Sequence, residues 1–127
     1  LPEGYHKIYE DFGIHEGYIV GPGVNLSGAN LSNAGLAGVD LTGVDLSGAN
    51  LSGTTLTGVT SGSITGTPTL PAAYGMFNGY IVGPGVDLTD VDLTGFDFTG
   101  FDLSGANLTG ATLIGSTLTD VASRRLS

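Results

Sequence analysis

The sequence has no cysteine, no tryptophan and only three basic residues, Lys7, Arg124 and Arg125. The absence of cysteine excludes disulfide bonds and thiol chemistry, but it leaves the compartment open. Twelve acidic residues oppose the three cations and give a formal net charge of −9. We therefore expect no direct nucleic-acid binding, which needs clustered lysine and arginine. We also expect no membrane span, because no apolar stretch approaches the roughly 20 residues that a span needs.

Glycine is abundant instead, at 23 of the 127 residues. Such a level would normally suggest disorder. A strict apolar register argues against disorder, because leucine or phenylalanine recurs at every fifth position in two runs. These central residues, which we expect to form the structural core, are Leu26, Leu31, Leu36, Leu41, Leu46, Leu51 and Leu56 in the first run, and Leu88, Leu93, Phe98, Leu103, Leu108, Leu113 and Leu118 in the second.

A small or apolar residue stands two positions before most of the central residues, as Ala29 does before Leu31 and Val86 does before Leu88. A five-residue period matches neither the helical period near 3.6 nor the strand period of 2. A fixed short repeat is typical of a solenoid. The pattern therefore predicts a solenoid with a narrow, continuous core.

The chain also repeats on a larger scale. The octapeptide GYIVGPGV occurs at Gly17–Val24 and again, unchanged, at Gly79–Val86, an offset of 62 residues. Each copy follows a Leu-Pro pair and leads directly into a five-residue run. The first such pair is Leu1-Pro2, where the sequence begins. We therefore expect a two-unit piece that is processed or excised from a longer tandem array.

The two periods together divide the chain into five parts. They are an N-terminal connector or cap over residues 1–23, a first solenoid run over 24–67, a second connector hairpin over 68–85, a second solenoid run over 86–122 and a C-terminal tail over 123–127. The end of the first run is less regular than the rest. Ser61 occupies a slot expected to hold leucine, although Val59 and Ile64 keep the five-residue step.

The connectors interrupt the short period and need another local structure. In the second connector Asn78-Gly79 stands between apolar strand-forming residues. This predicts a two-residue hairpin, because both turn positions must accept a positive φ. In the first connector Glu16-Gly17 is a weaker turn signal. Upstream of it, four apolar or aromatic residues have helical spacing and are followed by a glycine: Tyr5, Ile8, Tyr9 and Phe12. This pattern fits a short amphipathic helix, and an ordinary packed connector is the open alternative.

Segments such as GANLSG at Gly48–Gly53 and GANLTG at Gly105–Gly110 resemble the pentapeptide-repeat family, whose signature is A-(D/N)-L-x-x. The connectors are similar to those of long bacterial members of that family. The resemblance implies an all-β fold, a right-handed quadrilateral β-helix in two short runs separated by hairpin connectors. In this fold one repeat forms each face and four form a coil. The central residue and the one two before it point inward, so Leu26 would stack under Leu46.

Three phenylalanines depart from the family pattern. Phe96 and Phe101 occupy positions where the family prefers a small residue, and Phe98 lies between them. Their role stays open among three interpretations: they fill space against the connector hairpin, they plug a wider coil, or they line a ligand pocket.

No combination of residues resembles a catalytic site, so we expect no enzyme activity, no cofactor and no small-molecule substrate. The two histidines, His6 and His15, have Glu10, Asp11 and Glu16 nearby. These residue types can ligate a metal, but the spacing fits a solvated surface better, and we predict no metal site.

Aspartates precede the central residues in the second run, at Asp87, Asp92, Asp97 and Asp102. By the family geometry they lie on four successive faces and form an acidic surface that rings one coil. A ring disperses charge, which favours solubility over a focused ion site. Calcium binding at Asp90 and its neighbours matches no known loop spacing.

The open ends of a solenoid lead to the functional hypothesis. Unpaired strand edges promote association unless they are capped, and head-to-tail contacts that do not close give filaments. We therefore expect a non-enzymatic structural module, a homo-oligomer that self-associates through its solenoid ends into a filament or surface assembly. An extracellular or cell-surface location is favoured over a cytoplasmic one. The alternative is a protein-binding module, either an acidic DNA mimic that acts on DNA gyrase or a cell-surface adhesion segment.

Overall fold

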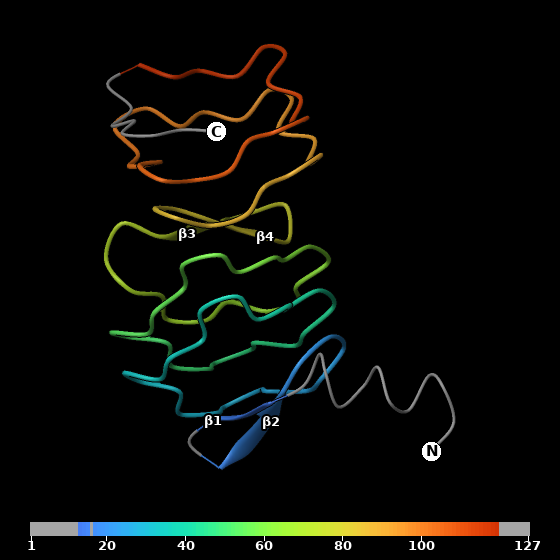
Figure 1. Ribbon diagram of the computed structural model, residues 1–127, viewed down its shortest axis with the longest axis vertical. Coiled ribbons are helices and arrows are strands. Elements are labelled where there is room, and N and C mark those ends of the chain that lie inside the picture. The colour runs from blue at the N-terminus through green and yellow to red at the C-terminus, as the bar shows by residue number, and fades with distance from the viewer. Residues whose placement is uncertain (1–12, 16, 120–127) are drawn as a thin grey trace.

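The computed structural model describes residues 13–15 and 17–119. These residues contain four short β-strands and no helix. Outside the strands the chain winds into coils that stack along one axis (Figure 1). The segment over Tyr5–Phe12, for which a short helix and an ordinary packed connector are both open interpretations, lies outside the described residues.

Backbone bridges between residues 20 positions apart set the height of each coil. Asn25 pairs in parallel with Asp45, and Asp87 pairs in the same way with Asn107. The N–H of Leu26 donates to the carbonyl of Asp45 at 2.8 Å, and the N–H of Asp45 donates to the carbonyl of Val24 at 3.1 Å. Four five-residue repeats therefore complete one coil. Neighbouring coils are separated by the spacing of paired strands, about 4.8 Å.

A tight turn in each repeat changes the direction of the chain. The N–H of Ala29 donates back to the carbonyl of Leu26 at 3.0 Å. The residue two positions after the central leucine takes a positive φ, and glycine holds that position in most repeats. Among the described residues, the exceptions are Asn33 at 62° and Asp90 at 61°, which are the residue types that tolerate this conformation. The glycine content therefore follows from the turn, and Asp90 has a conformational role.

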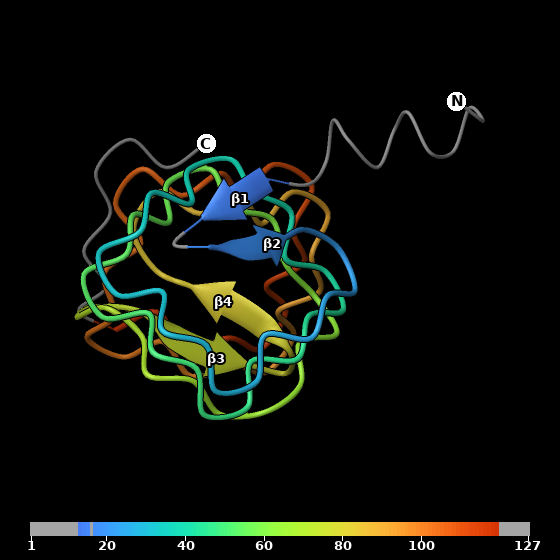
Figure 2. The same ribbon diagram turned by 90° about the horizontal axis from the view of Figure 1, so that it is seen from below.

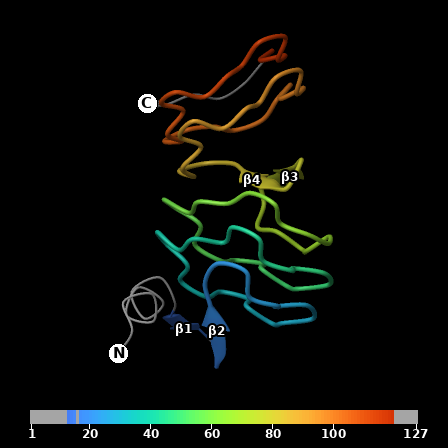
Figure 3. The same ribbon diagram turned by 90° about the vertical axis from the view of Figure 1, so that its right-hand side faces the viewer.

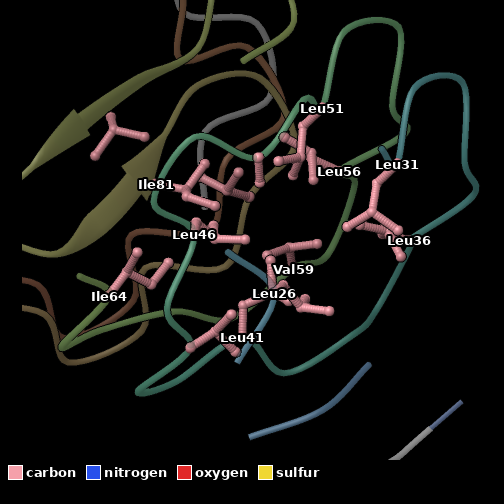
Figure 4. Packing of buried hydrophobic residues seen from close by; sticks show 14 of the residues in the cluster. Leu26, Leu31, Leu36, Leu41, Leu46, Leu51, Leu56, Val59, Ile64 and Ile81 are labelled. Atoms are coloured by element: carbon pink, nitrogen blue, oxygen red, sulfur yellow. The ribbon is translucent and has the colours of Figure 1, made fainter. Parts of the chain in front are cut away.

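The interior of the coils is filled by the central residues (Figure 4). Eleven of the fourteen are at most 2% exposed, from Leu26 to Leu56 and from Leu88 to Leu103. Complete burial of one such side chain contributes about 1.5–3 kcal/mol. Two of the slots that stand two positions before a central residue hold a hydroxyl instead of an apolar group. Thr54 donates to the carbonyl of Leu31 at 3.0 Å, and Ser116 donates to that of Leu93 at 2.6 Å.

Each unit also contains one β-hairpin. In the first unit β1 (Gly13–His15) pairs with β2 (Tyr18–Val20), and in the second β3 (Gly75–Phe77) pairs with β4 (Tyr80–Val82). Both pairs are antiparallel and share one register, since Gly13 faces Val20 as Gly75 faces Val82. Seen along the axis, both hairpins lie across the width of the coils (Figure 2). The hairpin expected at Asn78-Gly79 is therefore present.

The two runs form one column, with the β3–β4 hairpin between them (Figures 1 and 3). The N–H of Asp87 donates to the carbonyl of Val59 at 2.9 Å, across 28 residues, where the matching bond from Asp45 to Val24 spans 21. The second connector therefore adds seven residues without breaking the stack. Bridges in the first run continue to Thr69, which pairs with Asn50, so coiling extends beyond the expected boundary at residue 67.

Candidate functional site

The aspartates before the central residues use their carboxylates within their own turns. Asp92 accepts hydrogen bonds from the N–H of Thr94 at 3.0 Å and from its hydroxyl at 2.5 Å. Asp97 accepts the same two bonds from Thr99. These bonds stabilise the charged form, so they hold the pKa of Asp92 and of Asp97 below the ordinary value.

Asparagine performs the same task elsewhere in the coils. Asn50 accepts from the N–H of Ser52 at 2.9 Å and from its hydroxyl at 2.7 Å, and Asn107 accepts both bonds from Thr109. An uncharged amide oxygen therefore suffices for the turn. Within the described ranges no three histidine, cysteine or acidic side chains lie close enough together to hold a metal ion. The acidic surface is thus a set of turn-forming side chains, and nothing in its geometry gathers the charges.

The stacking of the coils also keeps the aspartates of neighbouring coils apart. Asp40 pairs with Thr60, Asp92 with Thr112 and Asp97 with Thr117. Asp87 pairs with Asn107 above it, and its bond to Val59 places it beside Thr60 below. Each of these aspartates therefore stacks against a neutral residue of a neighbouring coil, which limits charge repulsion between coils.

The β3–β4 hairpin is seated on the last coil of the first run. The N–H of Ile81 donates to the Oγ of Ser61 at 2.9 Å, and the N–H of Ile64 donates to the carbonyl of Gly79 at 3.1 Å. Ile81 is completely buried. A Cβ on Gly62 would lie 3.1 Å from the ring of Tyr80, so glycine at that position makes room for the ring.

The second run covers the hairpin from the other side. The ring of Phe77 lies 5.8 Å from that of Phe96, 5.3 Å from that of Phe98 and 5.4 Å from that of Phe101, between centroids. These distances are typical of packed aromatic pairs. The three phenylalanines therefore fill space against the connector hairpin, which was the first of the three interpretations.

A tyrosine fastens the connector to the turn after β4. The hydroxyl of Tyr74 donates to the carbonyl of Pro84 at 2.6 Å. Burial, and then the negative charge of Asp102, raises the pKa of the Tyr74 phenol. The hydroxyl therefore keeps its proton and remains a donor.

The β1–β2 hairpin is attached to its own run as β3–β4 is. The N–H of Gly23 donates to the carbonyl of Thr42 at 2.8 Å, and the N–H of Gly85 donates to that of Ser104 at 2.9 Å. Residues 23 and 85, and residues 42 and 104, are equivalent in the two units.

On the side facing away from their own runs, the two hairpins differ in exposure to solvent. Tyr18 is 38% exposed and Ile19 is 59% exposed, whereas Ile81, which is equivalent to Ile19, is 0% exposed. A Cβ on Gly17, in the turn, would meet nothing within 4 Å, whereas a Cβ on Gly79 would lie 3.0 Å from the backbone nitrogen of Ser63. The same octapeptide therefore makes one enclosed hairpin and one hairpin with an open face.

The C-terminal end of the column is also partly open. Leu118 is 46% exposed, unlike its equivalent Leu56 at 1%. Ile114 is 74% exposed, but its equivalent Ser52 is exposed as well. Leu108 and Leu113 are partly buried. Leu118 thus departs from the expected core, because no bridge among the described residues joins its coil to a further one. Together with Tyr18 and Ile19, Ile114 and Leu118 complete the set of exposed large apolar side chains in the described part of the chain.

Some expected site residues lie outside the described part. His6, Glu10, Asp11 and Glu16 are among them, and the side chain of His15 in β1 is not described either. In residues 13–15 and 17–119 there is no helix that is long and apolar enough to cross a membrane.

A fold of five-residue turns stacked into 20-residue coils defines a class of β-solenoid proteins. The family model for pentapeptide repeats matches eight copies in this chain, over residues 23–59 and 85–121. These ranges cover more than half of the sequence, so the chain belongs to the pentapeptide-repeat family. Family membership implies a right-handed β-helix, and members of the family are generally non-enzymatic.

One solved structure is similar to the chain at 23% sequence identity and a TM-score of 0.33. It is the crystal structure of HetL, a pentapeptide repeat protein involved in heterocyst differentiation regulation, from the cyanobacterium Nostoc sp. strain PCC 7120. The match covers 80% of this chain, which spans about half, 49%, of the length of HetL. No curated protein matches the sequence.

Sequence reasoning missed two features of the hairpin seat. Ser61 looked like a defect in the leucine register, but its hydroxyl accepts the N–H of a hairpin residue 20 positions later. The partner of the phenylalanine cluster, Phe77, belongs to a connector that lies outside the five-residue pattern. The sequence did hold one signal for such a seat, the identity of the two octapeptides, because two hairpins of the same sequence should need similar surroundings.

Proposed function

We propose that the chain is a non-enzymatic structural module, a quadrilateral β-solenoid that self-associates end to end into a filament or surface assembly. The observation that supports this proposal is the difference between the two hairpins. In one, Ile81 is enclosed between coils; in the other, Ile19 of the same octapeptide is 59% exposed. The sequence of β2 is therefore suited to a covered environment that one copy of the chain leaves incomplete.

The free energy of covering this face is favourable. Removing apolar surface from water contributes about 25 cal/mol for each Å². Large exposed apolar side chains are found at both ends of the column, Tyr18 and Ile19 at one and Leu118 at the other. A contact between the two different ends is head-to-tail and leaves a free end at each side. Such contacts extend into open assemblies unless rotation closes them.

The acidic DNA-mimic alternative has less support. A duplex mimic needs rows of closely spaced charges, whereas Asp40, Asp92 and Asp97 each pair with a threonine in the neighbouring coil. We therefore favour the ends of the column over its acidic side walls as the surfaces that bind a partner.

The test is sedimentation velocity of the purified chain over a wide concentration range. We expect the sedimentation coefficient of the wild type to rise with concentration. Ile19→Ser should shift this rise to concentrations at least about tenfold higher, since about 1.4 kcal/mol of lost apolar contact changes an association constant tenfold. Ile114→Ser is the matched control, because Ile114 is 74% exposed and corresponds to a serine, Ser52, in the first unit.

A wild type that sediments as a uniform monomer at every concentration would contradict the proposal. An assembly that Ile114→Ser weakens as much as Ile19→Ser does would contradict the role given to the hairpin end.

A further inference from the structure

The edge of β2 that faces away from β1 presents open backbone groups. In the second hairpin Phe77 and Tyr80 close the two-residue turn, so the N–H of Ile81 points away from β3 by the alternation of an antiparallel pair. The first hairpin has the same register, and the N–H of Ile19 therefore points away from β1. Within residues 13–15 and 17–119, nothing outside β1 accepts from this N–H or donates to the carbonyl of Gly17.

The equivalent edge of β4 shows what satisfies these groups. The hydroxyl of Ser61 accepts the N–H of Ile81 at 2.9 Å, and the N–H of Ile64 donates to the carbonyl of Gly79 at 3.1 Å. Gly79 and Ile81 belong to the octapeptide whose first copy forms β2 and the end of its turn. One short segment, with its serine and its apolar residue three positions apart, therefore satisfies both groups of the edge.

This segment, residues 59–65, is called the seat segment, and its side chains also match the hairpin. Gly62 has a φ of 147°, and a Cβ on it would lie 3.1 Å from the ring of Tyr80. The position therefore needs glycine both for its backbone and for the ring. Ile64 is 7% exposed and belongs to the same buried core as Ile81. The seat segment thus combines a hydroxyl acceptor, a glycine and an apolar residue in the order Ser-Gly-x-Ile.

The seat segment of this chain already holds the chain's own β3–β4 hairpin. The edge of β2 has the same sequence as the edge of β4, yet Tyr18 is 38% exposed and Ile19 is 59% exposed. Open strand edges bind added segments through backbone hydrogen bonds, and side-chain pockets select the sequence of the segment. A partner that fits the edge of β2 must therefore supply another segment of the Ser-Gly-x-Ile type.

We propose that the outer edge of β2 is a docking site for a Ser-Gly-x-Ile segment at the end of another pentapeptide-repeat coil. In this contact the serine hydroxyl accepts the N–H of Ile19, the glycine leaves room for the ring of Tyr18, and the N–H of the isoleucine donates to the carbonyl of Gly17. The site goes beyond the proposed function, because it defines the partner by its chemistry and does not require a copy of this chain.

The test adds a synthetic peptide with the sequence of the seat segment, residues 59–65, to the complete chain. Hydrogen exchange followed by NMR reports on each amide, at a concentration where the chain sediments as a monomer. Without peptide, the amide of Ile81 should be protected and that of Ile19 should exchange rapidly. Peptide at about ten times its Kd should slow the exchange of the Ile19 amide about tenfold.

Two peptide variants that each lose one hydroxyl form a matched pair. In the peptide, Ser61→Ala removes the acceptor of the Ile19 N–H and should weaken binding about three- to tenfold. Ser63→Ala should leave the affinity within about twofold of the unchanged peptide, because the side chain of Ser63 is exposed in the internal junction. A third peptide with Gly62→Ala should not protect Ile19, since its Cβ would meet the tyrosine ring.

The outcomes separate this site from the proposed function. Rapid exchange of the Ile19 amide at every peptide concentration, or equal losses from the two serine changes, would overturn the docking site and leave end-to-end association untouched. Slow exchange of this amide in the monomer without peptide would also overturn it, because the chain itself would then cover the edge. Protection by the peptide in a chain that never assembles would support the site and contradict the proposed function.

Discussion

At most positions in the described coils, the residue before the central leucine or phenylalanine accepts a hydrogen bond within the local turn. Asp92 and Asp97 accept the N–H and hydroxyl of the threonine two positions later, and Asn50 and Asn107 accept the matching bonds from serine or threonine. A short side chain with a terminal oxygen makes these bonds, although the turn also forms after Gly35, where the N–H of Val39 donates to the carbonyl of Leu36 at 3.0 Å. Aspartate and asparagine therefore serve the turn equally well. The choice between them affects only the charge of the coil and the dependence of its stability on pH.

The aspartates should make the stability of the fold depend on pH. Hydrogen bonds from Thr94 and Thr99 lower the pKa of Asp92 and Asp97 in the folded chain. A carboxyl whose folded pKa lies below its unfolded value adds stability above the unfolded pKa, and this stability is lost as pH falls through the folded pKa. We expect the thermal midpoint to be steady near neutral pH and to fall in acid, below about pH 4.

The double variant Asp92→Asn, Asp97→Asn isolates this effect. It should keep the turns, because asparagine already forms them at residues 50 and 107, and it should reduce the fall of the midpoint in acid. Thermal unfolding followed by circular dichroism between pH 3 and pH 7 measures both quantities. An unchanged acid response would show that these two carboxyls do not contribute to it.

At the scale of elements, the β3–β4 hairpin holds the two runs in one column. It hydrogen-bonds to the first run through Ser61 and packs against the second through Phe77. The hairpin itself was predictable from Asn78-Gly79, since turn chemistry is local. The residues that contact the hairpin were not predictable. The contacts of Ser61 and Phe98 with it become evident only once the connector is placed between the two runs.

Restoring the five-residue pattern at Ser61 should destabilise the protein. Ser61→Leu removes the acceptor of the Ile81 N–H, and an unsatisfied buried donor costs about 1–3 kcal/mol. Ser61→Thr keeps the hydroxyl and is the matched control. Urea unfolding measures the free energy of each variant. A Ser61→Leu protein as stable as the wild type would mean that this hydrogen bond does not hold the hairpin.

For the whole molecule, the sequence predicted the coil and the duplication but not the continuity of the column. The five-residue step follows from side-chain burial within one coil, which sequence periodicity records directly. Continuity depends on a bond between Asp87 and Val59 across the connector, and no local pattern marks it. The open face at Tyr18 and Ile19 is visible only when it is compared with the covered face at Tyr80 and Ile81.

The geometry of the column predicts the geometry of the proposed assembly. A 62-residue unit, without the seven extra residues of its connector, contains eleven five-residue steps, about two and three-quarter coils. With coils about 4.8 Å apart, one unit rises about 13 Å and a chain of two units about 26 Å. If the contact between copies repeats the internal junction, each chain is also rotated by about half a turn relative to the previous one.

Electron cryomicroscopy of the assembled wild-type chain is the direct test of end-to-end association, because it measures the axial rise, the rotation and the surroundings of the hairpin. We predict filaments with an axial rise of about 26 Å per chain, a rotation near half a turn, and Ile19 of the β1–β2 hairpin enclosed against the end of the next copy. Particles that remain single columns at high concentration, or filaments in which Ile19 stays exposed to solvent, would contradict it.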